Sequence, residues 1–272
     1  MLLVGIKTSK KEAGKKHPFG YGKEQFFWSF IVATLIFSVS GVLSLEQGIA
    51  SLLGHEKHKL DDVPINFIIL GIASVFEGNS LRTAFKEFKR PIEERGGKLN
   101  LFTMITEFKE SKNPSILTVM VEDTAALLGI LIAAIALSIS FVTGDTIYDA
   151  IASIIIGIML MAFSFFLAKE NKGLLIGELI STRDYKKIYT VIPKIPEVIE
   201  VVSIRSMQLA PEDVIIAIEI NLIDDLDTNK IESVIDSVEN KVKESIPYVN
   251  PSKLLLELEH DRKKSSYLTN TK

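Results

Sequence analysis

Two neighbouring carboxylates, Glu122 and Asp123, are the only charged residues in the long apolar stretch 113–144. A third acid, Glu77, is the only charged residue in another apolar stretch, 63–81. Carboxylates bind hard or borderline divalent cations through oxygen. Burial also favours the protonated form of a carboxyl group, so clustered acids can exchange a metal ion for protons. These residues therefore favour proton-coupled transport of a divalent cation.

The positions of the acids on their helices predict where they face. A charged side chain near the centre of a bilayer costs about 2.5–3.5 kcal/mol, so these acids must face protein or water. Helical spacing places three acids, Glu77, Glu122 and Asp149, each on a stripe of small and polar residues, and we expect these stripes to face one another. The stripes are Asn66, Ala73, Glu77, Ser80 and Ala84; Ser115, Thr118, Glu122, Ala125, Gly129, Ala133 and Ala136; and Asp149, Ser153, Gly157 and Ser164.

Adjacent residues of a helix point about 100° apart, so Glu122 and Asp123 have different roles. Two alternatives remain open at this stage. Protonated acids can act as structural hydrogen bonds between helices, and this applies to Glu122, Asp123 and Glu77. Asp149, near the end of its stretch, can instead be a residue of the helix start or of the membrane rim.

Four apolar stretches have the length needed to cross about 30 Å of hydrocarbon. They predict spans at about 26–45, 63–81, 114–142 and 147–168, within a transmembrane domain over 25–170. The first opens on Phe26, Phe27 and Trp28, which is typical of an interfacial aromatic belt. The fold class is therefore a mainly α membrane protein with a transmembrane helical bundle.

The distribution of Lys and Arg predicts the orientation. Basic residues gather in the segment 1–24 and in the loop between the second and third spans, whereas the loop between the first two spans has only Lys57 and Lys59. Loops rich in Lys and Arg lie on the cytosolic side of a membrane, so we expect both termini in the cytosol. We expect the protein to lie in the cell membrane. Because hydrophobic spans flank these basic residues, we do not expect them to bind nucleic acid. There is no cysteine for a thiolate site, and the four histidines lie outside the spans, so we expect no enzyme.

Residues 171–262 have the composition of a small soluble domain, followed by a polar tail, 263–272. Apolar spacing predicts a helix over 184–195 with Asp184 as its cap, and an amphipathic helix around 231–242. Strands are expected at 198–209, 214–222 and 254–258. The order is α-β-β-α-β, and apolar faces left over favour dimerisation.

Three motifs in order, HPFGYGKEQFFW, VEDTAALLGI and YDAIASIIIG followed by KENKGLLIGE, resemble those of the cation diffusion facilitators. Within that family the pattern is most similar to the branch that includes the mitochondrial zinc transporter nine. The resemblance implies a homodimer of six-span subunits with a cytosolic, ferredoxin-like C-terminal α/β domain. It also implies transport of zinc, with manganese or iron as alternatives, in exchange for protons and with no tightly bound cofactor.

The sequence departs from the family pattern at the transport site. Family members usually place a His and an Asp four residues apart on the fifth span, and here Asp123 matches the Asp whereas Val119 stands at the His position. The resemblance favours Asp123 and the stripe favours Glu122, so both stay candidates, together with Glu77. Either Glu122 supplies the missing ligand or the metal preference shifts toward oxygen ligands.

Two further metal sites of the family are also altered. His17 matches a metal-binding His of the loop motif, but Tyr21 stands where the second His is expected. Metal-binding members also carry His residues on the strands of the C-terminal domain. Here the corresponding positions hold Val202, Glu219 and Glu257. Two further candidates, His260 and Asp261, lie nearby.

The chain resembles the family from the tail of its second span, "MLLVGI", onward, so we expect an N-terminally truncated sequence. The function expected is a proton-coupled divalent metal transporter of the zinc type. Val119 keeps an alternative open: a non-transporting membrane scaffold or partner subunit with a degenerate metal site.

Overall fold

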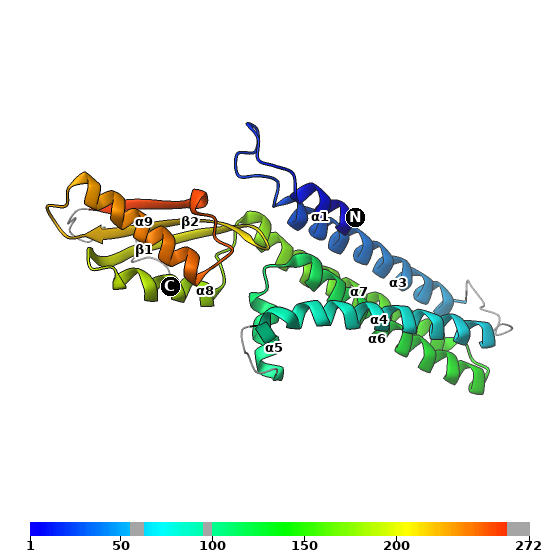
Figure 1. Ribbon diagram of the computed structural model, residues 1–272. Helices are drawn as coiled ribbons and strands as arrows, with labels where there is room; N and C mark the ends of the chain where they lie inside the picture. Colours follow the sequence, from blue (N-terminus) through cyan, green and yellow to red (C-terminus); the bar gives the residue numbers. More distant parts are fainter. Residues whose placement is uncertain (55–62, 95–99, 260–272) are drawn as a thin grey trace. The chain divides into compact units, whose positions relative to one another are not determined.

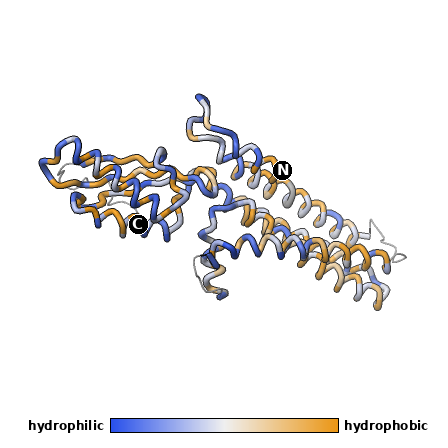
Figure 2. The backbone as a smooth tube through the Cα atoms, viewed as in Figure 1, coloured by the Kyte–Doolittle hydropathy of each residue, from blue (hydrophilic) through white to orange (hydrophobic). Residues whose placement is uncertain are grey.

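The computed structural model describes residues 1–54, 63–94 and 100–259. The chain forms two compact units, Met1–Leu175 and Ile176–Lys272. Among the described residues, four helices are long and apolar enough to cross a membrane, which confirms the predicted helical bundle. Figure 2 shows their hydrophobic colouring. They extend over Glu24–Leu52, Val63–Glu94, Pro114–Thr143 and Ile147–Ile176.

The first candidate span consists of α2 (Glu24–Ile31), a π-helical turn (Val32–Phe37) and α3 (Ser38–Leu52). A short preceding helix, α1 (Leu2–Ser9), packs on α2 so closely that a Cβ at Gly5 would lie 2.8 Å from the Cβ of Trp28. The predicted aromatic belt is wrong for Phe26, which is fully buried, because its side chain turns into the protein; Phe27 is exposed.

The second and third candidate spans, α4 (Val63–Glu94) and α6 (Pro114–Thr143), pack against each other and lie side by side in Figure 1. A short amphipathic helix, α5 (Leu101–Glu110), precedes α6. The start and end of α6 follow from its sequence. Asn113 caps it by accepting a hydrogen bond from the backbone N–H of Ile116, and Gly144 ends it in the left-handed conformation, φ 71°.

The fourth candidate span, α7 (Ile147–Ile176), packs against α3 through small residues. A Cβ at Gly157 would lie 2.8 Å from the carbonyl oxygen of Gly41, so glycine allows the two backbones to touch. Ser38 and Ser164 share a hydrogen bond of 2.8 Å, and Ser44 donates to the carbonyl of Ser153 over 2.8 Å.

The expectation that all three stripes face one another is therefore wrong for the stripe of α7. Its small residues meet those of α3. The expectation is also wrong for α4 and α6, because Glu77 of the α4 stripe meets Asp123, which lies beside the α6 stripe and not on it. The physical reason is that glycine and serine on α3, which the stripe analysis did not include, complement the small face of α7.

The second unit contains a three-stranded sheet in the order β1-β2-β3, with β1 and β2 antiparallel and β2 and β3 parallel. Isoleucine and valine side chains from the inner face of the sheet and from its helices form one buried core. The order of its elements, α-β-β-α-β, is the predicted one. Its elements are α8 (Thr182–Val191), β1 (Val198–Ala210), β2 (Asp213–Leu222), α9 (Thr228–Ser245) and β3 (Leu254–Glu259).

The predicted cap of α8 is wrong. Ser181 is the cap, because its hydroxyl accepts from the backbone N–H of Asp184, whereas the Asp184 carboxylate accepts side-chain hydrogen bonds. The tail 263–272, with His260 and Asp261, lies outside the described residues, as do Lys57 and Lys59.

Candidate metal centre

Glu77 on α4 and Asp123 on α6 are acids of two different candidate spans, and they lie close together. The packing of α4 on α6 brings them close enough for the two carboxyl groups to interact electrostatically. Asp123 is only 5% exposed, and its Oδ2 has no hydrogen-bond partner among the described residues. We call these two residues the carboxyl pair. An acceptor oxygen that is buried and unpartnered suits a cation or a proton.

Glu122 has a different environment from its neighbour. It is half-buried and near enough to the carboxyl pair to interact electrostatically with both acids. It follows Ser115 and Thr118 on the stripe of α6 that meets α2, since Gln25 of α2 donates to the Ser115 hydroxyl over 2.9 Å. The two neighbouring acids therefore lie on different faces of α6, as their angular separation predicts.

The described residues contain no group of three His, Cys, Asp or Glu side chains arranged to hold a metal ion. The carboxyl pair supplies two oxygen-bearing groups, while zinc usually takes four ligands. Val119, at the position where a histidine would complete a His–Asp pair with Asp123, is half-buried and has no ligand atom.

Two other candidates lie apart from the carboxyl pair. Asp149 is in the first turn of α7, just after the end of α6 at Thr143. About 30 Å of helix separate Asp123 from that end of α6. His17 is exposed in a tight turn, where its backbone N–H and C=O bond those of Gly14 at 3.0 and 3.1 Å. The His17 ring lies 4.5 Å from that of Tyr21. Neither residue meets another predicted ligand.

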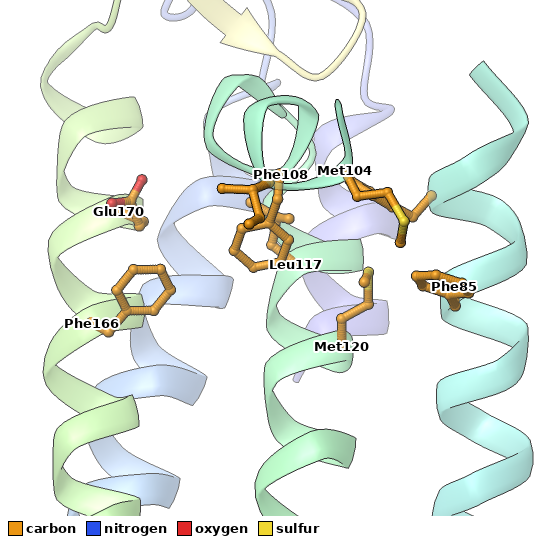
Figure 3. A pocket seen from close by; sticks show the side chains of 9 residues that line it. Phe85, Met104, Phe108, Leu117, Met120, Phe166 and Glu170 are labelled. Carbon is orange, nitrogen blue, oxygen red and sulfur yellow. The ribbon is translucent and has the colours of Figure 1, made fainter. Parts of the chain in front are cut away.

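A separate apolar pocket of about 510 Å³ lies between α4, α5, α6 and α7 (Figure 3). Met120, one helical turn from Asp123, lies in its wall, and Glu170 is the acid at its edge. With a lining that is otherwise apolar, the pocket does not suit a metal ion. Its walls are Phe85, Phe88, Met104, Ile105, Phe108, Leu117, Met120, Phe166 and Glu170.

The candidate sites of the C-terminal domain are engaged in ordinary interactions. Glu219 accepts a hydrogen bond of 2.7 Å from Ser203, and it is the register partner of Glu257 across β2 and β3. Asp184 of the same domain is held in its charged form. Burial alone would raise the pKa of its carboxyl group, but hydrogen bonds from Lys187, Tyr248 and Ser181 outweigh burial and hold that pKa below its usual value.

Sequence reasoning missed the α2 side of this region. Gln25 and Ser29 are buried polar residues on the face of α2 that meets α6. The signal that could have found them is the spacing Gln25, Ser29, Ala33, a stripe of polar and small residues at steps of four.

Comparison with known proteins gives one family match, three relatives and one similar solved structure. Residues 1–176 match the cation efflux transmembrane domain. The chain is 30% identical to Metal tolerance protein C4 of Arabidopsis thaliana, over 69% of this chain and 40% of that protein. It is 28% identical to the mitochondrial proton-coupled zinc antiporter SLC30A9 of Homo sapiens, over 77% of this chain and 36% of that protein. It is 24% identical to Magnetosome protein MamB of Magnetospira sp., over 92% of this chain and 76% of that protein.

A solved structure of the MamM CTD aligns with 29% of this chain and 94% of its own length, at 16% identity and a TM-score of 0.27. The chain spans 40% and 36% of the length of the plant and human relatives. The matched domain is one of transport rather than catalysis. Because that domain extends over residues 1–176 of 272, the chain belongs to the cation efflux family, the cation diffusion facilitators, and is similar to its SLC30A9 branch.

Proposed function

We propose that this protein carries a divalent cation of the zinc class across a membrane in exchange for protons. The carboxyl pair, Glu77 and Asp123, binds the ion, and Glu122 adds negative charge beside it. Family membership supports metal transport in general, and the relatives named as zinc antiporters support zinc. The single observation that carries the carboxylate site is the contact between α4 and α6, which joins two acids within apolar spans.

The pair fits a cation for an electrostatic reason. Two carboxyl groups in contact inside a low-dielectric region cannot both carry a charge without a compensating cation or proton. A divalent ion compensates two charges, and when it leaves, protons must replace it. Exchange of metal for protons is the consequence of this burial.

The test is zinc flux in vesicles that contain the whole protein, with a pH gradient across the membrane. Glu77→Gln and Asp123→Asn keep the shape of each side chain and remove its charge. We expect each variant to lower equilibrium zinc affinity by at least about tenfold, since even residues that only support a ligand cost that much. Asp149→Asn is the matched control and should bind zinc as the unaltered protein does.

Two results would contradict the proposal. Zinc flux that survives the combined Glu77→Gln and Asp123→Asn changes would show that the ion passes elsewhere. An equal loss of affinity in Asp149→Asn would show that the effect is not specific to the carboxyl pair.

The second candidate function, a non-transporting scaffold or partner subunit, is favoured by one observation. With Val119 in place of a histidine, the described residues contain no cluster of three metal ligands. This candidate predicts a stably folded membrane protein with neither zinc flux nor saturable zinc binding, so the same two assays separate it from the transporter.

The proposal also covers the orientation, the oligomeric state and the membrane of the protein. The basic loops support cytosolic termini. Exposed apolar side chains on the strands of the C-terminal domain, Ile199, Leu255 and Leu258, support a homodimer. We assign the protein to the cell membrane. Protease accessibility in sealed right-side-out vesicles tests the orientation, because the C-terminal domain should be cleaved only after the vesicles are opened.

A further inference from the structure

The apolar pocket between α4, α5, α6 and α7 is larger than the voids that protein interiors usually contain. Its volume of about 510 Å³ falls in the range of small-molecule sites, whereas native interiors have few voids larger than a water molecule. All of its walls belong to the first compact unit. Two of them, Ile105 and Phe166, are 49% and 40% exposed, so a ligand can enter from the surface of the helix bundle. The size and the opening of the pocket indicate a ligand site.

Four phenylalanines determine the chemical character of the walls. Phe108 of α5 has two of the others as ring neighbours: its centroid is 6.1 Å from that of Phe88 on α4 and 6.5 Å from that of Phe166 on α7. Phe85 already holds a cation, because the Nζ of Lys89 lies 4.5 Å from its ring centroid. The face of an aromatic ring is electrostatically negative and attracts cations. The three other rings can offer the same kind of contact to a ligand.

Of the described residues that line the pocket, Glu170 alone is charged. It follows Phe166 by four residues, so the two side chains share a face of α7, and Figure 3 shows both on that helix. Glu170 has no hydrogen bond or ion pair with any other described residue. Lys169 and Lys172 are one and two positions away, where side chains point to other faces of the helix. The carboxylate is therefore available to a cation in the pocket.

We propose that this pocket binds a lipophilic organic cation, of the class of quaternary ammonium and phosphonium compounds. The aromatic rings and the carboxylate are complementary to the positive charge. The apolar walls are complementary to bulky organic substituents. Met104 and Met120 add flexible, polarizable side chains, which adapt to the shape of a ligand. The site is separate from the carboxyl pair, and its ligand does not depend on zinc transport.

The charge of the lining distinguishes this ligand from a lipid. A phospholipid or a fatty acid would place an anion beside Glu170, and the described lining has no Lys or Arg to bind that anion. An uncharged acyl chain would fit the apolar walls but would gain nothing from the carboxylate. The residues of the pocket therefore favour a cation over either kind of lipid group.

Binding of tetraphenylphosphonium, a lipophilic cation without hydrogen-bonding groups, tests the site. Equilibrium dialysis with the detergent-solubilised full chain, and with the detergent alone as blank, should show saturable binding of one cation per chain. Tetraphenylborate has nearly the same size and shape but a negative charge, so it should not compete. Either the absence of saturable binding or equally strong competition by tetraphenylborate would overturn the proposal.

Glu170→Gln tests the carboxylate at an exposed position, where the fold should tolerate the change. In low-salt buffer it should lower the affinity for tetraphenylphosphonium by at least about fivefold, the equivalent of about 1 kcal/mol for opposite charges 4 Å apart in water. Added salt should weaken binding to the unaltered protein but have little effect on the variant. Glu87→Gln, at an exposed acid of α4 outside the lining, is the matched control and should keep the affinity within about twofold. Equal affinity of the Glu170→Gln variant and the unaltered protein would contradict the proposal.

Phe166→Leu tests the aromatic wall. It removes one ring, keeps an apolar side chain, and should lower the affinity by about fivefold. Phe165→Leu is the matched control, because Phe165 is 75% exposed and lies outside the lining, so the affinity should change by less than about twofold. Equal losses in the two variants would show that the effect does not come from the pocket. Thermal unfolding verifies that each variant is folded, and if Phe166→Leu is not, the Glu170→Gln result still decides.

Lipid analysis of the purified protein tests the competing occupant. Tetraphenylphosphonium at saturation should displace any lipid that co-purifies in the pocket. A phospholipid retained at one per chain, which the cation does not displace, would identify the occupant as lipid and refute the cation site. None of these measurements involves zinc, so they decide the site even if the proposed transport function fails.

Discussion

Replacing Gly157 by alanine should loosen the contact between α3 and α7. The added Cβ would lie 2.8 Å from the carbonyl oxygen of Gly41, where ordinary contacts begin at 3.4 Å, so the helices must separate by about 0.6 Å. Three hydrogen bonds of 2.8 Å join the first span to α7 there: Ser38 with Ser164, Ser164 to Ala33 and Ser44 to Ser153.

The expected magnitude follows from three contributions. Overpacking costs about 1–3 kcal/mol. Weakening three hydrogen bonds between membrane helices costs up to about 2 kcal/mol, at about 0.6 each. Alanine offsets about 1 kcal/mol of this loss, because its helix propensity is higher than that of glycine. The net loss in the free energy of unfolding is about 2 kcal/mol.

Gly71→Ala on α4 is the matched control, since nothing lies within 4 Å of its Cβ position. It should be neutral or stabilising by up to about 1 kcal/mol, so the two substitutions have opposite signs. Thermal unfolding in detergent measures both.

A disulfide provides a second readout. The chain has no cysteine, so the combined Ser38→Cys and Ser164→Cys changes report on this contact alone. Oxidation should cross-link the pair readily, and Gly157→Ala should slow it. If Gly157→Ala unfolds like the unaltered protein and cross-links at the same rate, α3 and α7 do not meet through their glycines.

Four further outcomes are expected. Val119→His places an imidazole one turn from Asp123 and should raise equilibrium zinc affinity by at least about tenfold, whereas the exposed Thr124→His should not. Asp184 has a lowered pKa in the folded state, so its stabilising effect is present at neutral pH and is lost as the pH falls below the ordinary aspartate value of about 3.9; Tm measured against pH should show this loss, and Asp184→Asn should abolish it. Asn113→Ala removes the cap of α6 and should destabilise the protein by about 1 kcal/mol in thermal unfolding. Ile218→Ala opens the core of the C-terminal sheet, where the side chain is 1% exposed, and should cost about 2–5 kcal/mol in denaturant unfolding.

Local sequence patterns were sufficient for the four candidate spans and for the helix and strand order of the C-terminal unit, but they did not predict α5. Apolar length alone identifies the four candidate spans, because crossing a bilayer requires about 20 apolar residues. The alternation in β2, with Val214, Ile216, Ile218 and Ile220 buried, follows from the two-residue period of a strand. Element ends were less certain: Ser181 rather than Asp184 caps α8, since both residue types can cap a helix and only geometry separates them.

The sequence by itself determined which acids lie within apolar spans and that Glu122 and Asp123 point in different directions, because helix geometry fixes the angle between neighbours. Only the tertiary structure decided what lies beside them: Asp123 meets Glu77 of α4, and Ser115, on the same stripe as Glu122, bonds Gln25 of α2. The rotation of a helix about its own axis is set by the surfaces that pack against it. For the same reason, the small face of α7 could be read from the residues, but its contact with α3 could not.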